Sequence, residues 1–99
     1  MKLLNILRED FVLMVSLPRN CPELARIAVD AGAQCLKVHI NCHHFASDTT
    51  FRSWKEERSV IEEIKAACGK VPLGLVTGET TQPGIPDLEE ITEFGFDFW

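Results

Sequence analysis

The sequence predicts an α/β fold made of repeated strand–helix units. Short apolar segments alternate with amphipathic segments along the chain, and a glycine follows each of three amphipathic segments. We expect four strands joined by three connecting helices, after a short N-terminal helix. Helical crossovers between neighbouring strands require parallel pairing and right-handed connections, so the predicted sheet is parallel.

The first strand and the first full helix follow a short N-terminal helix predicted at residues 2–9. Residues 11–17 form a continuous apolar run, which is typical of a strand buried on both faces. Asn20 and Glu23 have the spacing of an N-terminal helix cap with a reciprocal carboxylate. The helix that follows would bury an apolar stripe and end at a glycine; these residues are Leu24, Ile27, Ala28, Ala31 and Gly32.

The second strand is predicted at residues 35–41, where apolar and polar side chains alternate strictly. Lys37, His39 and Asn41 would share the face that points away from the covering helices. Packing alone does not explain a polar triplet there, so we interpret these residues as candidate site residues. The opposite, helix-facing set comprises Leu36, Val38 and Ile40.

The rest of the chain continues the pattern. Residues 42–52 would form a long polar loop. Ser53 and Glu56 repeat the capping-box spacing ahead of a helix that ends at Gly69. The remaining predicted elements are a strand at 71–77, a helix opened by Pro86 and Asp87 and closed by Gly95, and the start of a fourth strand at 96–99.

Two architectures fit this order of elements. One is a half-barrel with strand order 1-2-3-4, and the other is an open, flavodoxin-like sheet in which the order reverses. Residues 28–38 read Ala-Val-Asp-Ala-Gly-Ala-Gln-Cys-Leu-Lys-Val, and residues 93–98 read Glu-Phe-Gly-Phe-Asp-Phe. Both resemble the helix–strand joint of phosphate-binding (β/α)8 (TIM) barrels of the ribulose-phosphate-binding-barrel-like superfamily. The resemblance favours the half-barrel.

The resemblance implies that residues 1–99 are a single incomplete domain, the N-terminal half of such a barrel. A complete barrel needs roughly 200–250 residues. The end of the sequence at Phe98-Trp99, in the middle of a predicted strand, is what a truncated barrel would show.

In such a barrel the carboxyl ends of the strands build the site. Lys37 would act as a Schiff-base nucleophile or proton donor and His39 as a proton shuttle. Glu79 would serve as a general acid or base and Asp97 would assist, while the expected substrate-binding residues are Asn41, Thr80 and Thr81. The alternative interpretation is structural: Lys37 pairs with Asp97 and fills the interior, and the segment after the third strand is a turn.

A metal site is a weaker candidate. The densest set of metal-capable side chains comprises His39, Cys42, His43 and His44, whose thiolate and imidazole groups suit zinc or iron. The alternative is a loop at a strand end with partly exposed imidazoles. We therefore expect no cofactor, with a divalent metal as the lesser possibility.

The composition limits the classes of function. Hydrophobic residues make up 45% of the chain and charged residues 25%, which is the balance of a globular domain. The net charge of −5 argues against nucleic-acid binding, and no apolar run reaches the length of a membrane span or signal peptide. We expect a cytoplasmic protein whose cysteines are reduced.

These observations lead to an enzyme hypothesis with two alternatives. The chain would be the N-terminal part of a TIM-barrel lyase or isomerase that acts on a small phosphorylated metabolite, with the fragment alone inactive. Alternatively, it would be a non-catalytic fragment or half-barrel module that closes its open edges by self-association into a homodimer. For the enzyme, the expected partner is a missing C-terminal half. The third possibility is a flavodoxin-like binding domain.

Overall fold

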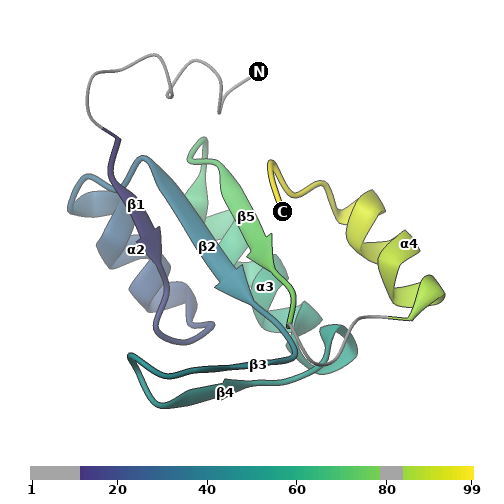
Figure 1. Ribbon diagram of the computed structural model, residues 1–99. Coiled ribbons are helices and arrows are strands. Elements are labelled where there is room, and N and C mark those ends of the chain that lie inside the picture. The colour runs from purple at the N-terminus through teal and green to yellow at the C-terminus, as the bar shows by residue number, and fades with distance from the viewer. Residues whose placement is uncertain (1–11, 79–83) are drawn as a thin grey trace.

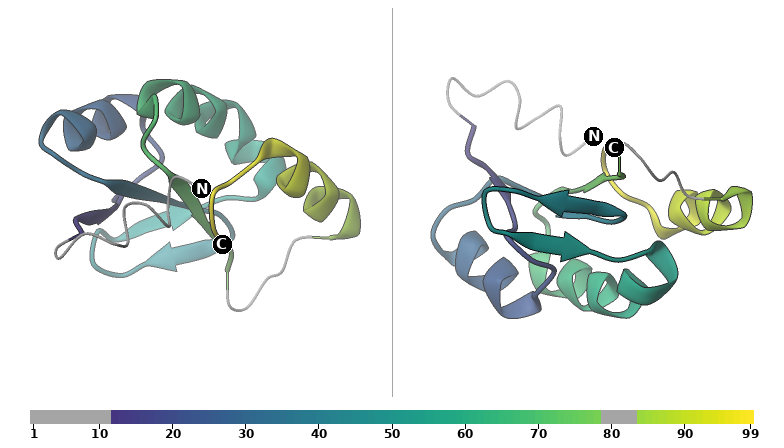
Figure 2. Two further views of the ribbon diagram at one scale, coloured as in Figure 1. Left: turned by 90° about the horizontal axis from the view of Figure 1, so that it is seen from above. Right: turned by 60° about the horizontal axis from the view of Figure 1, so that its bottom comes forward.

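The computed structural model describes residues 12–78 and 84–99 and shows a mixed α/β fold (Figure 1). Three parallel strands form one sheet in the order β1-β2-β5, and they are β1 (Met14–Ser16), β2 (Cys35–His39) and β5 (Leu73–Val76). The connections between them contain the helices α2 (Pro22–Asp30) and α3 (Trp54–Cys68). Both helices lie on the same face of the sheet (Figure 2). The predicted parallel βα organisation is therefore confirmed for these three strands.

The predicted four-stranded half-barrel is not formed by the described residues. An antiparallel pair, β3 (Cys42–His44) and β4 (Thr49–Phe51), replaces the long polar loop expected at 42–52. Where a fourth strand was predicted, Phe98 makes only an isolated parallel bridge with Gly74. The strand order also lacks, within the described residues, the reversal that a flavodoxin-like sheet requires.

The β3–β4 hairpin has local causes that the polarity of the segment concealed. Asp48, at the turn, has a φ of 51°, a left-handed conformation that aspartate tolerates better than most residues. Thr49, Thr50 and Phe51 then supply the β-branched and aromatic side chains that strands favour. Phe51 is 3% exposed, so one buried ring anchors the hairpin to the rest of the domain.

The core lies between the sheet and the helices. Leu36, Val38 and Ile40 are each 0% exposed and belong to this core, which confirms the predicted helix-facing side of the second strand. The predicted stripe of the first helix was wrong by about one residue. Ala25 is buried, whereas Ile27 is 63% exposed, because α2 turns its Leu24–Ala25 and Ala28–Val29 face toward the core.

The predicted helix ends are confirmed more often than the predicted caps. Gly69 and Gly95 have positive φ and follow α3 and α4 (Ile85–Phe94). The residue that caps α2 is Cys21, which makes no side-chain cap hydrogen bond, so the expected capping role of Asn20 is wrong. Ser53 does precede α3, but its hydroxyl hydrogen-bonds the Glu56 carboxylate at 3.1 Å and caps no backbone N–H.

Helix α4 packs beside α3 through aromatic rings. Trp54 meets Phe94 and Phe96 edge to face, and its indole N–H donates to the Glu90 carboxylate at 2.9 Å. The predicted N-terminal helix at 2–9 lies outside the described residues. Within 12–78 and 84–99, no helix has the length and apolar character that crossing a membrane requires.

Candidate functional site

A cleft of about 420 Å³ lies at the carboxyl end of the parallel sheet. The end of β2, the β3–β4 hairpin and the end of β5 form its walls, and the hairpin crosses beneath the strand ends (Figure 1). Ligands of parallel α/β sheets bind at this end of the strands. The residues that line the cleft are His39, Asn41, Cys42, His43, His44, Phe45, Val76 and Thr77.

His39 is the most unusual residue of the cleft. It is 5% exposed, and its Nδ1 atom is buried without a hydrogen-bond partner among the described residues. Burial lowers the pKa of His39 from 6.5 to about 4, and the nearby His44 and Lys37 add to this effect. The imidazole is therefore neutral at pH 7, and its buried Nδ1 has no partner within the described part of the chain.

The backbone next to His39 is held by hydrogen bonds in two directions. The Ile40 N–H donates to the carbonyl of Val76 at 3.0 Å, and the Asn41 N–H donates to the carbonyl of Arg52 at 2.8 Å. Asn41 itself has a φ of 53°, which turns the chain out of β2 and into the hairpin. A Cβ atom at Gly78 would collide with the Asn41 carbonyl oxygen, so only glycine fits at this close approach.

The other imidazoles already have partners. His43 contacts the Asp48 carboxylate through Nε2 at 3.3 Å and hydrogen-bonds Thr50 Oγ1 through Nδ1 at 2.9 Å. His44 Nδ1 lies 2.7 Å from the hydroxyl of Ser47, and its ring centroid is 5.1 Å from that of His39. These contacts assign His43 and His44 partners within the hairpin itself.

The predicted metal candidates do lie together around the cleft. Nevertheless, the described ranges contain no group of three or more His, Cys, Asp or Glu side chains arranged to hold a metal ion. Burial raises the pKa of the Cys42 thiol, which disfavours the thiolate that a soft metal would need.

Lys37 and Asp97, both predicted as catalytic residues, lie in different parts of the sheet. Lys37 shares the sheet face of His39, by the alternation of β2, but does not line the cleft. Asp97 lies at the opposite end of the sheet, where its carboxylate accepts the N–H of Leu73 at 2.9 Å. No ion pair joins Lys37 to Asp97 in the described residues. The structure thus brings together His39 and Asn41, with Lys37 nearby, and leaves Asp97 apart.

Glu79, Thr80 and Thr81 lie outside the described residues, so their predicted roles stay predictions. Sequence reasoning missed Phe51 as the ring that covers His39, and Val76 and Thr77 as cleft residues. Thr77 carried a usable signal, because it ends a predicted strand at the same edge of the sheet. Phe51 carried none, because its contact depends on the hairpin.

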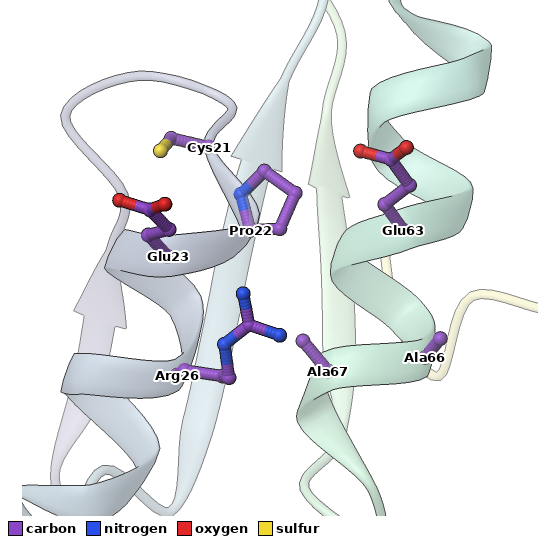
Figure 3. A pocket seen from close by; sticks show the side chains of 7 residues that line it. All are labelled: Cys21, Pro22, Glu23, Arg26, Glu63, Ala66 and Ala67. Carbon is purple, nitrogen blue, oxygen red and sulfur yellow. The ribbon is translucent and has the colours of Figure 1, made fainter.

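A second hollow of about 630 Å³ lies between α2 and α3, on the helical side of the domain (Figure 3). The Arg26 side chain extends there from α2 toward Ala67 on α3, with Glu63 higher on the same helix. Arg26 makes no ion pair within the part of the chain that the structure describes. No buried unpaired polar atom faces this hollow in the described residues, so the cleft at His39 is the stronger candidate site.

No protein-family model, curated protein or solved structure matches this chain. The resemblance to a ribulose-phosphate-binding-barrel-like half-barrel is therefore wrong, since no family matches and the described strands form a three-stranded sheet plus a hairpin. The misleading signal was the Ala-Gly-Ala joint. Gly32 has a φ of 107°, so this glycine answers the local need to leave α2 and enter β2, a need that many α/β folds share.

Proposed function

We propose that the cleft binds a small metabolite that carries a hydroxyl or carbonyl group, and that His39 recognises it. The observation that carries this proposal is the buried, unpaired Nδ1 of His39 among the described residues. Leaving a buried polar atom without a partner costs about 1–3 kcal/mol, so such atoms call for an explanation. His39 also lines the cleft, so a ligand oxygen that reaches this atom after a turn of the ring would supply one.

The form of the imidazole sets which groups it can recognise. With its pKa lowered to about 4, His39 is neutral at pH 7. A neutral imidazole has one donor nitrogen and one acceptor nitrogen, so it pairs with a carbonyl or with a hydroxyl. It gives no net charge to attract a strongly anionic group.

The remaining lining supports the same ligand class. Among the described residues that line the cleft there is no Asp, Glu, Lys or Arg. Asn41 and Thr77 supply an amide and a hydroxyl, and Val76 and Phe45 supply apolar contact. A volume of about 420 Å³ suits a small molecule. Recognition in this cleft would rest on hydrogen bonds and shape more than on ion pairing.

We assign the site to the reaction class of lyases and isomerases that remove a proton next to a carbonyl group. In that step the proton leaves carbon for a base, and the electron pair moves onto the carbonyl oxygen. A neutral imidazole stabilises the resulting oxyanion by donating a hydrogen bond. With a pKa of about 4, His39 suits this role better than that of the base. Glu79 stays a predicted general acid or base.

The proposal is tested by an NMR titration with dihydroxyacetone. Glycerol, which has hydroxyl groups but no carbonyl group, is titrated beside it, and weaker binding of glycerol would show that the carbonyl group adds to recognition. We expect amide shifts confined to residues 39–45 and 76–77 with dihydroxyacetone, and at least tenfold weaker binding in His39→Phe. Arg26→Ala, in the hollow between the helices, should bind as the native chain does. Shifts scattered over the domain, or equal binding by His39→Phe, would show that His39 is not the recognition residue.

The reaction class is tested separately by deuterium exchange. Dihydroxyacetone is incubated with the protein in deuterium oxide, and loss of its carbon-bound protons is followed by NMR. Exchange faster than in buffer, and reduced to the buffer rate in His39→Phe, supports the lyase or isomerase assignment. Binding without exchange would make the cleft a binding site with no catalytic role for this ligand.

A further inference from the structure

The side chain of Asn20 takes the place of a strand residue beside β2. The Leu17 N–H donates to the carbonyl of Lys37 at 3.0 Å, and Pro18 follows directly. One step further along β2, the Asn20 amide nitrogen donates to the carbonyl of His39 at 2.9 Å. The Asn20 amide oxygen accepts the His39 N–H at 3.4 Å, a longer and weaker contact.

The Asn20 side chain can take the place of a backbone group because a carboxamide has the same donor and acceptor as a peptide group. Asn20 therefore satisfies both backbone groups of His39 on the β1 side of the strand. Without it, the strand end that carries the candidate site residue would have open hydrogen-bonding groups at an edge of the sheet.

Glu57, in the first turn of α3, completes the arrangement. The Asn20 amide nitrogen also donates to Glu57 Oε2 at 2.8 Å. The other carboxylate oxygen of Glu57 accepts the backbone N–H of Arg52 at 3.4 Å, directly after β4. Two side chains thus connect the loop after β1, the end of β2, the end of the hairpin and the start of α3.

We infer that Asn20 and Glu57 are a positioning pair that fixes the imidazole of His39 in the cleft, an inference that rests on the proposed function of His39. Neither residue lines the cleft, so both act through the backbone of His39 and the end of the hairpin. The pair connects the end of β2, which carries His39, to the end of the hairpin, where Phe51 stacks on the His39 ring.

The first test needs no substitution and no ligand. In the isotope-labelled native protein, a scalar coupling between the side-chain amide nitrogen of Asn20 and the backbone carbonyl carbon of His39 reports their hydrogen bond directly. We expect this coupling to be observed. Its absence, together with fast exchange of the His39 amide proton, would overturn the inference even if every variant failed to fold.

The second test compares amide exchange at two neighbouring residues. In Asn20→Ala, the His39 amide proton should exchange at least tenfold faster relative to Ile40 than in the native protein. Ile40 is the internal reference, because its N–H donates to Val76 on the other side of the strand. Equal acceleration at both residues would indicate general destabilisation and would count against a positioning role.

The third test follows the ring itself. In Asn20→Ala, the shift of the His39 ring protons caused by stacking on Phe51 should shrink, and dihydroxyacetone binding should weaken about tenfold. Asn20→Asp combined with Glu57→Gln restores a hydrogen bond between the two positions but leaves the His39 carbonyl without a donor, so it should recover the native ring shifts only in part, and more than Asn20→Asp alone. Glu62→Gln, on the same helix but paired with Arg58, is the matched control and should change neither signal.

The two proposals fail in different ways. Native ring shifts and exchange ratios in Asn20→Ala would overturn the positioning role, whether or not dihydroxyacetone binds. Altered ring shifts without any dihydroxyacetone binding by the native protein would leave the positioning pair intact and overturn the proposed ligand.

Discussion

The imidazole of His39 lies stacked on the phenyl ring of Phe51, with the ring centroids 4.8 Å apart and the planes inclined by 24°. Phe51 is the last residue of β4, so this contact seals the hairpin onto the end of β2. It also removes one face of the imidazole from water. The hairpin therefore contributes to the burial that lowers the pKa of His39 and keeps the ring neutral.

The first prediction concerns this stacked pair. Phe51→Ala should raise the pKa of His39 toward 6.5, because water would reach the ring, and should destabilise the domain by roughly 3–5 kcal/mol. NMR titration of the ring and urea unfolding measure the two effects. Phe45→Ala is the control on the same hairpin, since Phe45 is 87% exposed, and it should change stability by less than about 0.5 kcal/mol. An unchanged pKa in Phe51→Ala would show that Phe51 does not control the ring.

The second prediction is that replacing His39 weakens ligand binding but stabilises the domain. His39→Phe should stabilise the domain by about 1 kcal/mol, because it removes a buried nitrogen that has no partner in the described part of the chain and keeps a planar ring against Phe51. That gain corresponds to a rise in Tm of about 4–8 °C. His44→Phe, which loses the contact with Ser47, should not stabilise. A loss of stability in His39→Phe would mean that the nitrogen has a stabilising partner.

The third prediction is the pH dependence of stability. His39 has a lower pKa folded, about 4, than unfolded, about 6.5, so the unfolded chain binds the proton first as the pH falls. The contribution of His39 to the free energy of unfolding is fully present above pH 6.5. It is lost as the pH falls from 6.5 to 4, and the loss is up to about 3 kcal/mol. The difference in unfolding free energy between the native protein and His39→Phe isolates this contribution. A difference that does not vary with pH in this interval would contradict the lowered pKa.

The fourth prediction tests the wall of the cleft. Gly78→Ala places a Cβ atom against the Asn41 carbonyl oxygen, a rigid backbone group, and should destabilise by about 1–3 kcal/mol. It should also shift the NMR signals of Asn41 and Cys42. Gly84→Ala is the matched control, because its Cβ would meet Pro86 only at 3.8 Å, an ordinary contact. Equal stability of the two variants would show that Asn41 and Gly78 are not in close approach.

Local sequence patterns were sufficient to predict those features that depend on a single strand or helix. The alternation at 35–41 placed Leu36 and Val38 toward the helices and His39 on the other face, because the pleat of a strand leaves no other choice. Gly69 and Gly95 marked helix ends for a similarly local reason, their positive φ.

The role of Asn20 and the hairpin at 42–51 depend instead on contacts between segments that are far apart in the sequence. Asparagine is a common helix cap, yet the side-chain amide of Asn20 forms hydrogen bonds with His39 and Glu57, which are 19 and 37 residues away. The hairpin at 42–51 looked like a loop because its only deeply buried side chain, among those of β3 and β4, is Phe51. Residues such as these acquire their roles only when distant segments meet, so no window of the sequence reveals them.

The central claim is that His39 is a buried, neutral imidazole whose Nδ1 has no partner among residues 12–78 and 84–99. Nitrogen-15 NMR of the imidazole ring, recorded from pH 3 to 8, tests it most directly. We predict a single neutral tautomer at pH 7 that titrates with a pKa of about 4. A ring that titrates near 6.5, like an imidazole in water, would contradict the claim and remove the basis for the proposed site.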